Sequence, residues 1–182
     1  LIVNKIACDS SGYIWVATAN SGLFKINPEN NKAPSFTDLV SPTWNKSNTV
    51  NTLYIDKYQN IWFSTPSGLY SYGTQTNNWK QWLDNNRLQD CNIIKILSAD
   101  DQTLILGTEK NGLLIFNHRN NVLQKIDQYG ADHFRVSNNM IKSLWKDNDG
   151  TIWIGTLTGL DHLNYPADSI THLYSEQDNE YA

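Results

Sequence analysis

The feature that most constrains this chain is a motif that occurs four times along it. The copies are "VNKIACDSSGYIWVATANSGLFKI" at 3–26, "VNTLYIDKYQNIWFSTPSGLYSY" at 50–72, "IIKILSADDQTLILGTEKNGLLIF" at 93–116 and "IKSLWKDNDGTIWIGTLTGLDHL" at 141–163. Successive copies lie roughly 45 residues apart, a spacing typical of propeller blades built from four strands. The repeat therefore predicts one structural unit that recurs, and it excludes a fold with a single unrepeated core.

Each copy has the pattern of β-strands. A short aliphatic and aromatic segment ends in an Asp/Asn/Ser/Gly cluster, and a second segment such as "YIWVAT" or "IWIGT" is apolar on both faces. Such a run suits a strand in a sheet that is covered on both sides. A third strand starts at the glycine of each Gly-Leu pair, and a fourth follows a polar turn. We predict an all-β fold, a β-propeller with four four-stranded blades at residues 1–40, 47–84, 90–128 and 138–175.

Three residue registers define the repeat. Tryptophans are expected to bury a large apolar area between blades, and glycines to permit close backbone approach where the third strand begins, while threonines mark a register shortly before each Gly-Leu pair. A small residue follows each tryptophan position by two, so that bulky and small side chains interlock. Asp9, Asp56 and Asp147 recur at the end of the first strand, which indicates turn capping. The register residues are Trp15, Trp62, Trp153; Thr18, Thr65, Thr108, Thr156; Gly22, Gly68, Gly112, Gly159. Copy three departs from the pattern, with Ile105 at the tryptophan position.

Composition narrows the function. The formal net charge is −4 at pH 7, so no basic stripe for nucleic acid is expected. The four histidines do not have the spacing of metal ligands, and we expect neither a metal nor another cofactor. The chain begins inside an apolar strand-like segment without Met, which we interpret as part of a longer protein.

The consensus D-x-x-G-x-I-W-x-G-T-x-x-G-L resembles the repeat of the two-component regulator propeller family. It matches best at "DNDGTIWIGTLTGL" and "DSSGYIWVATANSGL", and more loosely at "DKYQNIWFSTPSGL". The resemblance implies a segment of a seven-bladed propeller in the periplasmic region of a hybrid sensor, anchored in the inner membrane through its parent protein. It further implies that this segment is not an enzyme, that the parent carries a histidine kinase and forms a homodimer, and that it detects oligosaccharides released from polysaccharides. The remaining blades and adjacent domains would be partners.

Loops between blades are the expected ligand site, because the joints from a fourth to a first strand share a face with the links between second and third strands. Aromatic and cationic groups there would suit a neutral or anionic sugar. The candidates are Trp44, Lys46, Arg87, Lys110, His133, Phe134 and Arg135. Phe134 or Trp44 could instead tuck under the loop as a plug.

Two other functions stay open. The propeller could be a scaffold for dimerisation or spacing without its own ligand. Streptogramin lyases also carry a D-x-x-G-x-x-W-type repeat, and a lyase would need a catalytic histidine, for which only His133 is well placed.

Overall fold

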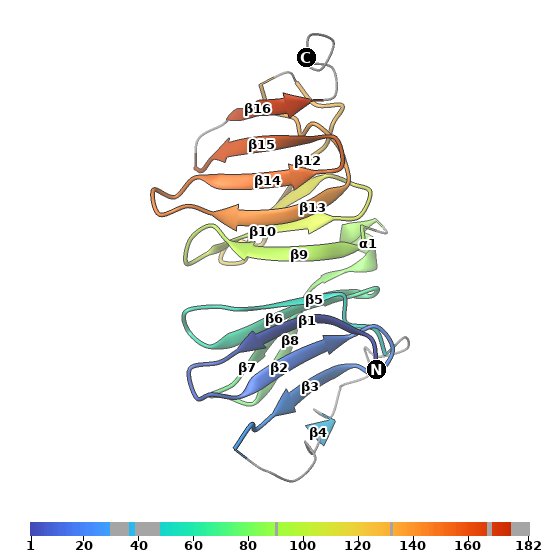
Figure 1. Ribbon diagram of the computed structural model, residues 1–182, viewed down its shortest axis with the longest axis vertical. Helices are drawn as coiled ribbons and strands as arrows, with labels where there is room; N and C mark the ends of the chain where they lie inside the picture. The colour runs from blue at the N-terminus through green and yellow to red at the C-terminus, as the bar shows by residue number, and fades with distance from the viewer. Residues whose placement is uncertain (30–36, 39–47, 90, 132, 167–168, 176–182) are drawn as a thin grey trace. The chain divides into compact units, whose positions relative to one another are not determined.

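The computed structural model describes the chain except for residues 30–36, 39–47, 90, 132, 167–168 and 176–182. The described residues form sixteen strands in four antiparallel sheets of four, each in the order of the chain. Figure 1 shows the course of the chain through them. The all-β prediction with four four-stranded blades is confirmed. We number the sheets blades 1 to 4.

Blade 1 holds β1 (Val3–Cys8), β2 (Ile14–Thr18), β3 (Leu23–Ile26) and β4 (Thr37–Asp38), and blade 2 holds β5 (Thr52–Ile55), β6 (Asn60–Thr65), β7 (Gly68–Gly73) and β8 (Asn78–Asp84). Blade 3 holds β9 (Ile93–Ser98), β10 (Thr103–Thr108), β11 (Leu113–Asn117) and β12 (Val122–Ile126), and blade 4 holds β13 (Ile141–Lys146), β14 (Ile152–Thr156), β15 (Gly159–Asn164) and β16 (Ser169–Ser175). A single helical turn, α1 (Asn85–Leu88), follows β8. The chain divides into unit 1 (Leu1–Ile93) and unit 2 (Ile94–Ala182).

Within each unit the two blades pack face to face. We call the side of a blade that carries Trp15, Trp62, Ile105 or Trp153 its tryptophan face, and the other side its opposite face. In unit 1 Trp15 and Ala17 share one buried cluster with Leu53, Phe63 and Tyr70 of blade 2. Alternation along the strands shows that the tryptophan face of blade 1 meets the opposite face of blade 2.

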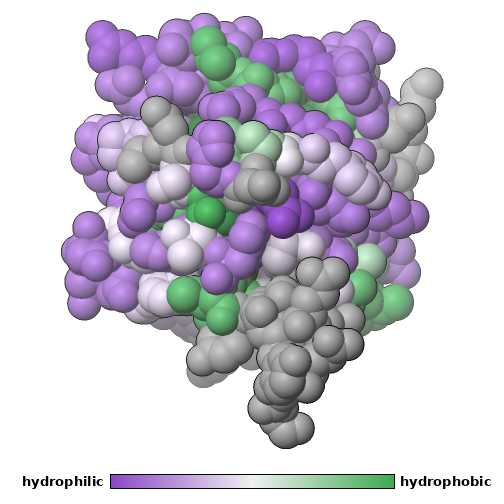
Figure 2. Space-filling model, turned by 90° about the horizontal axis from the view of Figure 1, so that it is seen from above, coloured by the Kyte–Doolittle hydropathy of each residue, from purple (hydrophilic) through white to green (hydrophobic). Residues whose placement is uncertain are grey.

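Unit 2 repeats this arrangement. Ile105 and Leu113 of blade 3 share a buried cluster with Ile152, Ile154 and Leu163 of blade 4. Ile105 therefore takes the place of the tryptophan and still fills the space between two blades. The surface shown in Figure 2 is mainly hydrophilic, with hydrophobic side chains in separate patches.

The recurring spacing of Asp and Trp within a copy has a direct structural cause. The Asp9 carboxylate accepts hydrogen bonds from the backbone N–H groups of Ser11 and Tyr13, at 3.0 Å each, and from Trp15 Nε1 at 2.8 Å. Asp56 accepts from Trp62 Nε1 at 2.9 Å in the same way. One carboxylate thus closes the turn and also satisfies the indole N–H of a buried tryptophan.

Blade 4 differs at this motif. The Asp147 carboxylate accepts from the Asn148 N–H, at 2.6 Å, and no hydrogen bond joins it to Trp153 in the described part of the chain. Trp153 is only half-buried and stacks on His162, with ring centroids 5.3 Å apart. Blade 4 meets blade 3 through its opposite face, so the place of Trp153 between two blades is not tested within unit 2 and stays a prediction.

The threonine register builds the link between second and third strands. Thr18 Oγ1 donates to the Gly22 carbonyl at 2.8 Å and accepts from the Ser21 N–H at 3.0 Å. Thr108 makes the equivalent pair of bonds with Gly112 and Asn111. At Gly112, where φ is +80°, a Cβ atom would lie 2.2 Å from the Ile126 carbonyl oxygen, so this turn requires glycine.

Candidate functional site

We call the loop from a fourth strand to the next first strand a joint, and the loop between a second and a third strand a link. In both units a joint lies at the same end of the blades as a link, as the sequence predicted. In unit 1 the Gly22 N–H donates to the Asn48 carbonyl at 2.7 Å, and Thr49 Oγ1 donates to the Ala19 carbonyl at 2.6 Å. In unit 2 the Gly112 N–H donates to the Asn139 carbonyl at 2.8 Å. These bonds tie each joint to the link of the preceding blade.

The joint between β12 and β13, residues 127–140, is the best described of these loops, and we call it the unit 2 joint. The Gln128 N–H donates to Asn139 Oδ1 at 2.8 Å, and the Asn139 N–H donates to Gln128 Oε1 at 3.1 Å. Val136 is fully buried beneath the loop. The described part of the joint is therefore held by its own hydrogen bonds over a buried valine.

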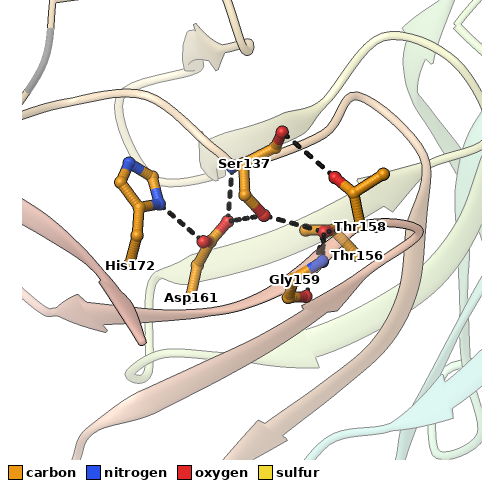
Figure 3. Close-up of polar contacts among 6 residues, drawn as sticks. All are labelled: Ser137, Thr156, Thr158, Gly159, Asp161 and His172. Carbon is orange, nitrogen blue, oxygen red and sulfur yellow. Dashed lines mark hydrogen bonds and ion pairs between the residues drawn. The ribbon is translucent and has the colours of Figure 1, made fainter. Parts of the chain in front are cut away.

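A buried carboxylate holds this joint near its C-terminal end, at Ser137, as Figure 3 shows. Asp161 on β15 has no exposed surface. Its Oδ2 accepts from the Ser137 N–H at 2.7 Å and from Ser137 Oγ at 3.1 Å, while its Oδ1 lies 2.7 Å from His172 Nδ1. The joint is thus fastened to two strands of blade 4.

The threonine of the blade 4 link extends this network. Ser137 Oγ lies 2.8 Å from Thr156 Oγ1, and Thr156 Oγ1 accepts from the Gly159 N–H at 3.0 Å. Thr158 Oγ1 contacts the Ser137 carbonyl at 3.4 Å. Joint and link therefore form one connected surface at this end of blade 4.

Ser137, Asp161 and His172 are not arranged as a catalytic triad, in which the histidine would contact the serine directly. Ser137 and His172 touch different oxygens of Asp161, so the imidazole does not receive the serine proton. His172 Nε2 is buried and has no hydrogen-bond partner among the described residues. In the same part of the chain no group of three His, Cys, Asp or Glu side chains could hold a metal ion. The contacts of Ser137, Asp161 and His172 are those of a network that positions the unit 2 joint.

The predicted ligand residues fall into three groups. His133 and Lys110 are exposed, on the unit 2 joint and on the link between β10 and β11. Phe134 and Arg135 are half-buried, and Phe134 packs against the core cluster of unit 2, as the plug alternative had it. Arg87 is exposed on α1 in unit 1. Trp44 and Lys46 lie outside the described residues.

Two features of the site were missed from the sequence. Tyr129 is 80% exposed on the unit 2 joint and is the aromatic ring most available there. Asp161 occupies the position that Phe24, Tyr70 and Leu114 hold in the other copies. Asp161 could have been recognised from the sequence, because it is a charged residue at a position that is apolar or aromatic in the other three copies.

A groove of about 210 Å³ lies beside the unit 2 joint. Its lining is uncharged and consists of Thr103, Ile115, Asn117, Asn120, Val122, Gln124, Phe134, Tyr165 and Pro166. Tyr165 closes it by linking blade 4 to blade 3, since its hydroxyl lies 2.9 Å from both Asp100 Oδ2 and Thr103 Oγ1.

The surroundings of Tyr165 and Asp100 change the pKa of both groups. Partial burial, together with Asp100, raises the pKa of Tyr165 above its ordinary value of 10.0, although the Thr103 hydroxyl acts against them. Partial burial acts to raise the pKa of Asp100, but hydrogen bonds from Gln102, Tyr165 and Thr103 lower it below 3.8 overall.

Comparisons with known proteins agree with the repeat. Residues 46–67 match the family described as two-component regulator propeller. This match falls on the second copy, which fits the consensus more loosely than the first and fourth. A histidine kinase P4 of Formosa agariphila is 23% identical over 95% of the chain, and the chain spans 13% of that protein.

Solved structures show the same fold. The extracellular domain of a putative hybrid two-component system from B. thetaiotaomicron has a TM-score of 0.74 at 21% identity, over 94% of this chain and 21% of that one. A streptogramin B lyase has a TM-score of 0.69 at 7% identity, over 96% and 55%. Such identities establish a propeller fold alone. Among the described residues no helix is long and apolar enough to cross a membrane.

Proposed function

Because the chain carries a repeat of the two-component regulator propeller family, we propose that it is a ligand-sensing segment in the extracytoplasmic region of a hybrid two-component sensor. The segment itself performs no chemistry. It binds an oligosaccharide released from a polysaccharide and passes the change to a histidine kinase in the parent protein, which is anchored in the inner membrane and acts as a homodimer.

The observation that carries this proposal is the construction of the unit 2 joint. The Asp161 carboxylate holds it from blade 4 and the Gly112 N–H holds it from blade 3, while Tyr129 and His133 stay exposed. A loop that is fixed in this way has little conformational entropy left to lose on binding. Its exposed aromatic ring offers a stacking surface for a sugar.

Charge around the joint favours an acidic sugar over a neutral one. Lys110 is exposed on the link that is bonded to the joint. Its ammonium group can donate charge-assisted hydrogen bonds to a carboxylate or sulfate. We therefore expect uronate-containing or sulfated oligosaccharides to bind more tightly than neutral ones.

Calorimetry with neutral, carboxylated and sulfated oligosaccharides tests the proposal. Tyr129→Ala should weaken binding of the best ligand about tenfold, equal to 1.4 kcal/mol, and Lys110→Met should weaken only the acidic ligands. Tyr58→Ala is the matched control, because Tyr58 is 55% exposed in the turn at the other end of its own blade. Equal losses for Tyr129→Ala and Tyr58→Ala, or no binding by any sugar, would exclude a ligand site on the joint.

A scaffold without its own ligand is the second candidate. Exposed apolar side chains favour it, since Trp145 is 58% and Ile6 57% exposed. Absence of sugar binding together with dimerisation of the parent protein through this segment would support that function.

A further inference from the structure

The groove beside blade 3 is not explained by the repeat. Its floor is the outer part of the tryptophan face, where Thr103 pairs with Asn117 and Ile115 pairs with Gln124 across neighbouring strands. Thr103 begins β10 and Asn117 ends β11, so both lie at the end of the blade opposite to the link between these strands. The described lining does not include Tyr129. The groove is therefore a different place from the exposed aromatic ring of the unit 2 joint.

Two aromatic rings from other parts of unit 2 form the walls of the groove. Phe134 is half-buried and belongs to the unit 2 joint, which is held against β16 by the hydrogen bond from the Ile170 N–H to the His133 carbonyl at 2.9 Å. Tyr165 is also half-buried, and its hydroxyl is bonded to blade 3. Because both rings are already held in place, a ligand that packs on them loses little additional conformational entropy.

The polar groups of the groove carry no charge. Gln124 is exposed, and its side-chain amide makes no hydrogen bond within the described part of the chain. Asn120 Oδ1 accepts from the Val122 N–H at 3.2 Å, which leaves the amide NH2 group of Asn120 as a donor. A charged ligand group in this groove would lose water without gaining a partner of opposite charge, which is costly. The lining therefore favours a neutral ligand.

We propose that this groove binds one ring of a neutral sugar, at a site separate from the one proposed on the unit 2 joint. Sugar hydroxyls donate and accept hydrogen bonds, as amides do, and the C–H face of the ring suits the aromatic and aliphatic walls. The volume of about 210 Å³ lies below the roughly 300–1,000 Å³ of sites for drug-sized ligands, so a single ring is the matching size. A proline-rich peptide also docks on aromatic grooves, but its proline rings have no donor for the amide oxygen of Gln124.

Heteronuclear NMR of the chain tests this site with methyl glycosides of neutral hexoses. The titration extends to about 50 mM, because a ligand of one ring is expected to bind in the millimolar range. The side-chain amide signals of Asn117, Asn120 and Gln124 should shift and saturate. The corresponding methyl uronate glycosides, with a free carboxylate, should bind at least about fivefold more weakly. This order is the reverse of the one expected at the unit 2 joint, so the two sites are distinguished by ligand charge.

Gln124→Leu removes the amide but keeps the size of the side chain, and it should weaken binding of the neutral ring about fivefold or more. Gln81→Leu is the matched control, since Gln81 is exposed on β8, the outer strand of a blade in unit 1, and should leave binding unchanged. Gln124→Ala replaces the leucine variant if that variant self-associates.

Three results would overturn the proposal. They are the absence of shifts with every neutral sugar, an unchanged dissociation constant in the Gln124 variant, and shifts at these amides with a proline-rich peptide but not with sugars. None of them affects binding of acidic oligosaccharides at the unit 2 joint, which is measured separately by calorimetry.

Discussion

At the scale of single residues, the spacing of Asp and Trp in the repeat follows from two hydrogen-bonding roles of one carboxylate. Asp9 caps a turn with Oδ1 and accepts the indole N–H of Trp15 with Oδ2. A buried indole without an acceptor would leave an unsatisfied donor, so the aspartate and the tryptophan six residues later depend on each other. Asp147 shows the converse, since Trp153 beside it is half-buried and does not need that acceptor.

Removal of the two carboxylates should therefore have unequal effects. Asp9→Ala leaves Trp15 Nε1 and two backbone N–H groups without their acceptor, and we expect the free energy of unfolding to fall by about 2–3 kcal/mol. Asp147→Ala, at the same register, should cost less than about 1 kcal/mol. Urea unfolding of both variants is the measurement, and similar losses would show that the indole bond contributes little.

Asp161 gives a second prediction at this scale. Asp161→Leu introduces the residue that blade 3 has at this register, so the interior should tolerate it, as buried ionic groups often can be replaced by apolar ones. The Ser137 N–H, however, loses its acceptor, and amide exchange across the unit 2 joint should accelerate about tenfold or more. Hydrogen exchange by NMR tests this, with Val122→Leu as the control. Unchanged protection of Ser137 would mean that the joint does not depend on Asp161.

At the scale of elements, Tyr165 links the turn after β15 to the first turn of blade 3. Its hydroxyl contacts Asp100 and Thr103 at 2.9 Å each, so it crosses from one blade to the next at the edge of the groove. The hydrogen bond to Asp100 adds to the apolar contact between blades 3 and 4. Because Asp100 titrates, the stability that this bond contributes depends on pH.

Tyr165→Phe should lower the free energy of unfolding by about 1 kcal/mol at pH 7. The pKa of Asp100 is lower in the folded than in the unfolded state, so its stabilisation is complete above pH 3.8 and is lost as pH falls through the folded-state pKa. The difference between wild type and Tyr165→Phe should therefore narrow below pH 3.8. Urea unfolding at pH 7 and below pH 3.8 measures the difference in free energy of unfolding, with the exposed Tyr129→Phe as control. A difference that is the same at the two pH values would contradict the link to Asp100.

At the scale of the whole molecule, local patterns predicted the blades because the repeat depends on neighbours in sequence. Asp9 closes its turn, as its repeated register indicated, whereas its bond to Trp15 and the bond from Thr18 to Gly22 were not predicted, although each joins residues of one copy. The Asp161 network was not predicted, since it joins Asp161 of the fourth copy to Ser137, 24 residues earlier in the joint that precedes that copy. The helical turn α1 was also missed, because its cap by Asp84 lies in a stretch that resembles an ordinary polar loop. Whether these blades belong to a seven-bladed ring stays a prediction.

The buried cluster described in unit 1 and the one described in unit 2 share no residue, which predicts that each unit responds separately to a destabilising substitution. Leu53→Ala opens a cavity in the cluster of unit 1 and Ile154→Ala one in the cluster of unit 2. Each should cost about 2–4 kcal/mol, as buried large-to-small changes do. In a repeat architecture stability is a sum of local terms, so each loss should stay within its own unit. Hydrogen-exchange mass spectrometry of peptides from β5–β7 and β13–β15 measures this. Faster exchange in both sets of peptides from either single change would show that the chain unfolds as one cooperative unit.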